Sequence, residues 1–161
     1  MSTTHVPPRT PTTAPSTLAT LGHTVLRAVL GIIFVLHGWQ KFNEWTIAGT
    51  QASFNDMGVP VADLAAPVLA VLELAGGVLL ILGLGTRVIA GLLALAMLGA
   101  LVLVHLPAGF FVGDGGHEFV LLLAAANVLF ALAGAGRWSV DHVIASRRRT
   151  PVAQEGTRTD V

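Results

Sequence analysis

The chain has 161 residues, of which 53% are hydrophobic and only 11% are charged, whereas charged residues make up about a quarter of a soluble domain. This composition is typical of an integral membrane protein. The formal net charge is zero, so there is no basic surface for nucleic acid, and the absence of cysteine excludes disulfides and thiol redox chemistry by this chain.

The two ends of the chain differ in composition from the rest. Residues 1–17 are rich in threonine and proline and lack an apolar run, which predicts a disordered segment rather than a signal peptide. Residues 146–161 are polar and carry an arginine triplet, so we expect a disordered basic tail next to lipid head groups. The membrane domain is therefore expected to cover residues 18–145.

Four apolar segments divide this domain. Each approaches the roughly 20 residues that span a hydrocarbon core, and none keeps the polar face of a helix in a soluble bundle. The segments cover residues 21–40, 64–84, 88–106 and 119–136. We therefore predict an all-α fold, an integral membrane four-helix bundle.

The connection between the first two segments has a helical pattern of its own. Apolar and polar residues recur at helical spacing before Gly58 and Pro60 end the pattern. The recurring residues are Ile47, Gln51, Phe54 and Met57. This spacing predicts a short interfacial helix in the first outer loop, with Trp45 as an anchor at the membrane surface.

Basic residues predict the orientation. With the N-terminus inside, eight of the nine lysines and arginines face the cytoplasm, and only Lys41 faces outward. The eight are Arg9, Arg27, Arg87, Arg137, Arg147, Arg148, Arg149 and Arg158. We therefore expect a multi-pass protein with both termini in the cytoplasm, an N-in/C-in topology.

Glu73 is the one charged residue within the second apolar segment, and it needs a partner. An isolated carboxylate at this depth costs several kcal/mol. Side chains lean toward the N-terminus of their helix, so Glu73 leans outward, toward His37, Lys41 and His105. An ion pair with Arg27 is the alternative. The carboxylate either holds helices together or serves as a proton-active or ligand-anchoring group, and both readings stay open.

The outer half of the bundle is expected to collect a polar cluster, a candidate ligand-binding site. Its members are Glu73, His37, Lys41, His105, His117 and Glu118. A quinone head group could bind among them, and haem ligated by two histidines is a weaker alternative. We expect no metal site, because the ligand set of two histidines and one glutamate crosses a flexible loop. No catalytic residue is identified.

Several motifs together resemble the DoxX family of small bacterial membrane proteins. They are RAVLGIIFVLHGWQKF (27–42), FNDMGVPVADLAAP (54–67), ELAGGVLLILGLGTR (73–87), HLPAGFFVGDGGHEFVLLL (105–123) and GAGRWSVDH (134–142). The resemblance covers roughly residues 22–145. It implies a four-helix bundle in the bacterial plasma membrane, with members acting as subunits of oxidoreductase complexes in redox protection. A related branch belongs to thiosulfate:quinone oxidoreductase, and cysteine-bearing relatives use a chemistry that this chain lacks. The positions in the recurrent motifs are Arg27, Lys41, Glu73, Arg87, His105 and Glu118.

The leading functional hypothesis is a membrane subunit, rather than a stand-alone enzyme, that anchors or couples soluble redox partners in oxidative-stress or quinone-linked chemistry. One alternative is a small-molecule or proton transporter that uses Glu73 as its carrier group, and another is a purely structural interaction protein. Membrane lipids are expected partners, and faces rich in small residues permit a homo-oligomer.

Overall fold

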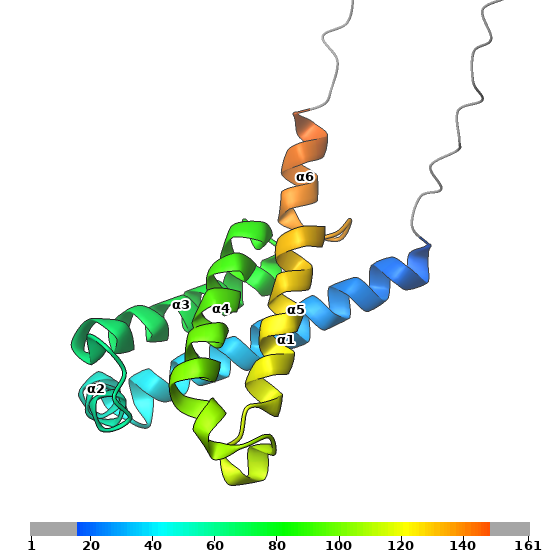
Figure 1. The fold of residues 1–161 in the computed structure, drawn as a ribbon. Coiled ribbons are helices and arrows are strands. Elements are labelled where there is room, and N and C mark those ends of the chain that lie inside the picture. The colour runs from blue at the N-terminus through cyan, green and yellow to red at the C-terminus, as the bar shows by residue number, and fades with distance from the viewer. Residues whose placement is uncertain (1–15, 149–161) are drawn as a thin grey trace, which may run out of the picture.

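A computed structural model describes residues 16–148, and this part of the chain forms helices and no strand (Figure 1). The helices are α1 (Thr17–Asn43), α2 (Thr46–Asp56), α3 (Ala62–Leu82), α4 (Thr86–Ala100), α5 (Glu118–Ala133) and α6 (Val140–Arg147). Within residues 16–148, three apolar helices are long enough to cross a membrane: α1, α3 and the stretch Thr86–Ala108 that continues α4. The all-α membrane fold is therefore confirmed, while α5, with 16 residues, is a shorter apolar helix.

The helix boundaries follow from local sequence signals. Ser16 begins α1, because its hydroxyl accepts a hydrogen bond from the Ala19 amide at 3.2 Å. Ser139 begins α6 in the same way, through the His142 amide. Most of the predicted disordered segments, 1–17 and 146–161, lies outside the described residues, and the N-in/C-in topology stays a prediction.

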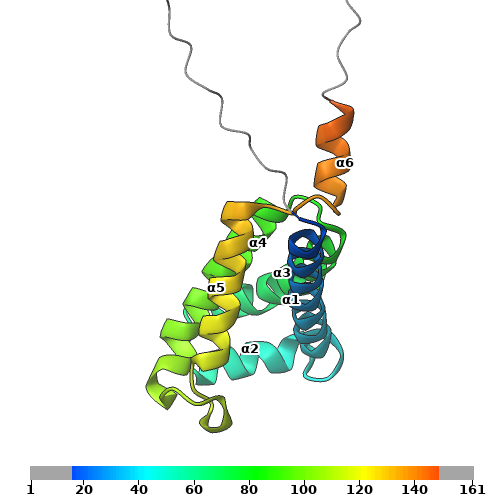
Figure 2. The ribbon, with the colours of Figure 1, turned by 90° about the vertical axis from the view of Figure 1, so that its right-hand side faces the viewer.

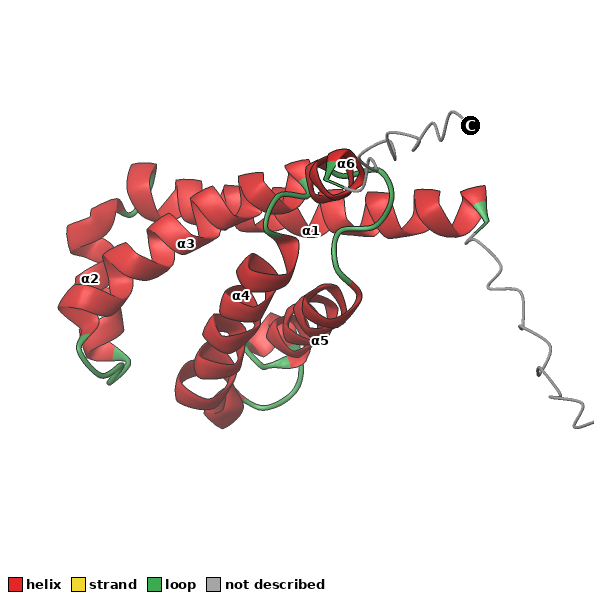
Figure 3. Cartoon of the chain, turned by 90° about the horizontal axis from the view of Figure 1, so that it is seen from above, coloured by secondary structure: helices red, strands yellow, loops and turns green. Residues whose placement is uncertain are grey.

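The helix predicted in the first outer loop is present as α2, which covers all but the last of the four residues that predicted it. The long helices form two antiparallel pairs, α1 with α3 and α4 with α5, and the two pairs run in different directions (Figures 1 and 3). The pairs meet where α3 packs on α4 and where α1 contacts α5. Two ring contacts make the second junction, His23 with Phe130 and His37 with Phe119.

Glycines bring α1 and α3 into close contact. A Cβ atom on Gly31 would lie 2.6 Å from the Gly77 carbonyl oxygen, and one on Gly77 would lie 2.6 Å from the Gly31 oxygen. A Cβ atom on Gly38 would lie 2.5 Å from the Leu74 backbone nitrogen. Gly76, next to Gly77, faces Ile89 of α4 instead. Small residues thus let helix backbones approach closely on two sides of α3.

The same contacts shift α1 along α3. Lys41, in the last turn of α1, lies beside Glu73, near the middle of α3. At about 1.5 Å per residue, roughly 15 Å of α3 extends past the end of α1. The short helix α2 packs against this extension. The polar connection that follows α1 therefore lies beside the middle of α3.

The molecule has two ends that differ in what they contain. The start of α1, the turn between α3 and α4, and α6 lie at one end, which we call the α6 end (Figure 2). The helix α2 and the connection between α4 and α5 lie at the other, the α2 end (Figure 2). Because α1 begins and α6 follows at the same end, the four long helices cross the molecule alternately.

Candidate functional site

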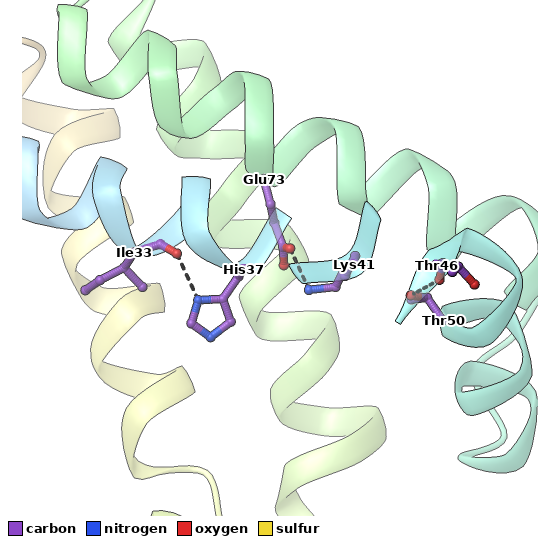
Figure 4. A network of polar contacts seen from close by, with 6 residues as sticks. All are labelled: Ile33, His37, Lys41, Thr46, Thr50 and Glu73. Atoms are coloured by element: carbon purple, nitrogen blue, oxygen red, sulfur yellow. Dashed lines mark hydrogen bonds and ion pairs between the residues drawn. The ribbon is translucent and has the colours of Figure 1, made fainter. Parts of the chain in front are cut away.

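A buried ion pair joins α1 to α3 (Figure 4). The Lys41 Nζ donates to Glu73 Oε2 at 2.6 Å, and the two residues are only 7% and 3% exposed. The outward direction predicted for the Glu73 side chain leads to this partner. Because an ion buried in apolar surroundings costs several kcal/mol unless it is paired, the pair explains how α3 keeps a carboxylate in its middle.

The end of α1 supplies the surroundings of the pair. The Trp45 ring, in the turn after α1, has its centroid 6.0 Å from the Lys41 Nζ. Thr50 of α2 is 1% exposed, and its hydroxyl donates to the Thr46 carbonyl within its own helix (Figure 4). The turn after α1 thus lies close to the pair, and α2 packs against both helices that carry it.

The pair has hydrogen-bonding capacity that the described residues do not use. An ammonium group has three donors and a carboxylate accepts at two oxygens. Within residues 16–148, the 2.6 Å contact is the single hydrogen bond that either side chain makes. A small polar ligand could therefore bind to both groups without breaking the contact between them.

His37 lies one turn before Lys41 on the same helix. Its Nδ1 is 2.8 Å from the Ile33 carbonyl oxygen, which can only accept, so Nδ1 carries the proton and Nε2 is the acceptor of a neutral ring (Figure 4). The ring stacks on Phe119 of α5, with centroids 6.3 Å apart. His37 is exposed on the apolar surface of the molecule, where Leu36 and Trp39 are also exposed.

The remaining members of the predicted cluster are His105, His117 and Glu118, and they make contacts within the connection between α4 and α5. The His105 Nδ1 is 2.7 Å from the Gly115 carbonyl oxygen, and Glu118 Oε1 accepts from the Val112 amide at 2.8 Å. His117 packs edge-on against Phe110. None of the hydrogen bonds or ion pairs within the described part of the chain joins these three residues to Lys41 or Glu73.

A π-helix precedes this connection. Leu101–His105 continue α4 with wider turns, and His105 is the last residue of that segment. Such segments are rare in proteins overall, and those that occur are often found at functional sites. Across the described residues, no three His, Cys, Asp or Glu side chains come close enough to hold a metal ion.

Arg27 does not pair with Glu73. It is 1% exposed and donates to three backbone carbonyl oxygens: those of Leu80, of Ile81 at 3.0 Å and of Trp138 at 2.8 Å. Two of these acceptors are among the last residues of α3, where the helix dipole favours a cation, and the Leu80 oxygen also accepts from the Gly83 amide at 3.0 Å. Arg27 therefore caps α3 and ties it to the segment before α6.

Asp141 has a structural role that the sequence did not reveal. Its two carboxylate oxygens accept from the Gly85 amide at 2.8 Å and the Thr86 amide at 3.0 Å, so it caps the start of α4. Its own amide donates to the Gly83 carbonyl oxygen. Helix caps are recognised in a sequence when the capping residue lies within a few positions of the helix start, whereas Asp141 is 55 positions from Thr86. We call Arg27, Asp141 and the backbone groups they bind the latch.

Comparisons with known proteins agree on one family. The model of the DoxX family matches residues 22–106. A Bacillus subtilis protein named "Putative oxidoreductase CatD" is 39% identical, over 75% of this chain and 85% of the relative. The Mycobacterium tuberculosis "Uncharacterized membrane protein Rv3486" is 34% identical, over 76% and 80%. The Escherichia coli "Inner membrane protein YqjF" is 32% identical, over 79% and 95%. No solved structure matches.

Proposed function

Because the chain belongs to the DoxX family of membrane proteins, we propose that it is a membrane subunit that couples redox partners at the bacterial plasma membrane. In this proposal the Lys41–Glu73 pair binds the head group of a quinone. The name of the Bacillus subtilis relative supports the redox class, and the name of the Escherichia coli relative supports the inner membrane.

The unused hydrogen-bonding capacity of the buried pair carries the proposal. A quinone head group offers two carbonyl oxygens as acceptors, and the reduced form offers two hydroxyl donors. The Lys41 ammonium can donate to the oxidised form, and Glu73 or the His37 Nε2 can accept from the reduced form. Few convergent polar groups within an apolar surface are typical of such sites.

The position of the site suits a lipid-soluble ligand. His37, Leu36 and Trp39 are exposed on α1, in a helix whose outward face is apolar. An isoprenoid tail could lie along that face while the head group reaches the end of α1. Haem ligation by His37 and His105 stays a prediction, and no contact within residues 16–148 joins these two side chains.

Quinone binding can be measured through tryptophan fluorescence, which quinones quench. Trp39 and Trp45 lie near the site, and Trp138→Phe removes the distant third tryptophan. In this background we expect Glu73→Gln to weaken the binding of a short-chain quinone by about tenfold, the effect of losing one charged hydrogen bond. Glu44→Gln makes the same chemical change on an exposed residue three positions after Lys41, and it should leave binding unchanged.

Two results would contradict the proposal. If Glu73→Gln lowers the unfolding temperature but keeps the quinone affinity, the pair has a structural role. If mild-detergent purification and mass spectrometry recover neither a quinone nor a redox protein, the coupling function is wrong.

A transporter for a small molecule or for protons is the second candidate, and the backbone around α2 favours it. Thr46, the first residue of α2, and Val61, the residue before α3, have φ angles of 58° and 53°, in the left-handed region that β-branched residues rarely adopt. Strained positions at the start of α2 and just before α3, next to the helices that carry the charged pair, suit a moving element. Proton flux into proteoliposomes that is abolished by Glu73→Gln would support transport over quinone binding.

We also propose that both termini are cytoplasmic, as the distribution of basic residues predicts. The chain has no cysteine, so single cysteines can be placed at will. A cysteine at Glu44 should react with a membrane-impermeant maleimide added to intact cells, and a cysteine at Arg148 should react only after lysis. The reverse pattern would overturn the orientation. Whether the chain forms a homo-oligomer can be measured in the same preparations.

A further inference from the structure

A cavity of about 520 Å³ lies at the α6 end, between the start of α4 and the end of α5. The cavity and the Lys41–Glu73 ion pair lie toward opposite ends of the long helices, and the quinone proposal does not use the cavity. Arg87, Arg137 and His142 line it together with the apolar side chains of Val88 and Ala133. The cavity thus combines cationic groups with an apolar wall.

The charge of the cavity is positive. No ion pair or hydrogen bond within residues 16–148 engages the guanidinium group of Arg87 or Arg137. Asp141 is the one acidic residue among the described residues that line the cavity. Both of its carboxylate oxygens already accept amide hydrogen bonds at the start of α4. Two arginines against one carboxylate leave a net positive charge at the cavity, and neither arginine forms an ion pair with Asp141.

Arg87 is positioned by the glycine that ends α5. Gly134 has a φ angle of 83°, and a Cβ atom there would lie only 3.1 Å from the Arg87 Nε. The missing side chain lets the guanidinium group lie across the end of α5. A second cavity of about 260 Å³ shares Arg137 and His142 and is bounded by Trp138. Arg137 of the α5–α6 connection and His142 of α6 therefore line both cavities.

The surroundings match the boundary of a membrane. Val88 and Leu132, at the ends of the two helices, are 68% and 73% exposed, and Trp138 is half exposed. Exposed aliphatic side chains below a tryptophan and a group of arginines are typical of the interface between lipid tails and head groups. Basic pockets between helix ends at this level suit phosphorylated head groups.

We propose that the cavity binds a phosphate group, held by Arg87 and Arg137, in the form of an anionic phospholipid whose tails lie along α4 and α5. The forked donors of arginine suit phosphate oxygens. A soluble phosphate compound has the same chemistry, and the test separates the two sources.

The test measures lipid binding by native mass spectrometry of the full chain in mild detergent. Phosphatidylglycerol is titrated against phosphatidylcholine, which has no net charge. We expect the variant with both Arg87→Gln and Arg137→Gln to bind phosphatidylglycerol about tenfold more weakly or worse, because each arginine near a charged lipid contributes about 1 kcal/mol. Arg148→Gln removes one positive charge just after α6, outside the cavity, and should leave the affinity within about twofold.

The outcomes separate the sources and the failures. Retention of phosphatidylglycerol in the presence of millimolar inorganic phosphate supports the lipid, and displacement supports a soluble phosphate compound. Unchanged affinity in the double variant, or equal weakening by Arg148→Gln, overturns the proposal. If the double variant does not fold, Arg137→Gln alone decides the question, since Arg137 is exposed in a connection and makes no hydrogen bond within the described residues.

Discussion

The two ends of the molecule use buried charges differently. At the α6 end, the buried Arg27 and the half-buried Asp141 bind backbone groups, and each charge has more than one main-chain partner. At the α2 end, Lys41 and Glu73 bind each other and keep hydrogen-bonding capacity unused. Burial is similar for Arg27 and Glu73, at 1% and 3% exposed.

The kind of partner that a charge has, backbone groups or one other side chain, distinguishes a structural role from a functional one better than the burial of the charge does. Arg27 binds three backbone carbonyl oxygens through its two terminal nitrogens, and its buried Nε has no hydrogen-bond partner among the described residues. A ligand that used the two terminal nitrogens would have to displace the backbone. A charge with one partner can stabilise the fold and still bind a ligand. Polar residues within membrane helices are commonly taken as functional, and Arg27 shows that such a residue can also bind the end of a neighbouring helix.

Loss of Arg27 should have the largest effect. We expect Arg27→Met to lower the free energy of unfolding in mild detergent by about 4 kcal/mol, because three buried carbonyl oxygens lose a charged donor. Arg27→Lys should restore little, since an ammonium group lacks the fork that reaches both α3 and Trp138. Leu26→Met, on the exposed face of the same helix, is the control. Equal stability of Arg27→Met and the wild type would show that the latch does not hold α3.

Breaking the Lys41–Glu73 pair should cost less, and the cost should be recoverable. Lys41→Met alone leaves a buried carboxylate, and we expect a loss of about 3 kcal/mol. Adding Glu73→Met should bring the unfolding free energy back to within about 1 kcal/mol of the wild type, since two apolar side chains replace two ions. A double variant that is less stable than either single variant would mean that the pair has further partners.

The Asp141 cap should have a smaller effect. We expect Asp141→Ala to lower the unfolding free energy by about 1.5 kcal/mol, as for other helix caps. Hydrogen exchange should rise at the Gly85 and Thr86 amides and remain unchanged in α2. Asp114→Ala, in the α4–α5 connection, is the matched control. Faster exchange in α2 would show that the two ends are coupled.

The smallest effect should come from the strained residue before α3, and it should have the opposite sign. Asparagine tolerates the left-handed conformation that Val61 adopts. We therefore expect Val61→Asn to raise the unfolding free energy by about 0.5 kcal/mol. If Val61→Asn destabilises the protein instead, the Val61 side chain contributes more than its backbone strain costs, and the argument for a movable α2 weakens.

The sequence predicted the helices well because their signals are local. The apolar runs located α1, α3 and the α4 stretch, and spacing located α2. The depth argument also included Lys41 among the partners of Glu73, since side-chain direction depends only on the helix that carries it. The placement of His105, His117 and Glu118 could not be predicted, because depth does not determine which side of a bundle a residue faces.

The shift of α1 along α3 was also beyond the sequence. The position of α1 along α3 depends on which glycine contacts which carbonyl group. The sequence gives no way to distinguish Gly76 from Gly77, although the two residues face different helices. The latch escaped prediction for a related reason. Arg27 and Asp141 bind backbone atoms, which every residue has, so no complementary residue type marks their partners.

The latch has a consequence for the assembly of the protein in the cell. Arg27 lies in the first helix, its acceptors at Leu80 and Ile81 end the third, and Trp138 and Asp141 follow the last long helix. The complete set of contacts can form only after the ribosome has delivered residue 141 to the membrane. Until then, α1 and α3 must be retained with these groups incompletely bound. A nascent chain truncated before Trp138 would therefore be a natural target for quality control by membrane proteases.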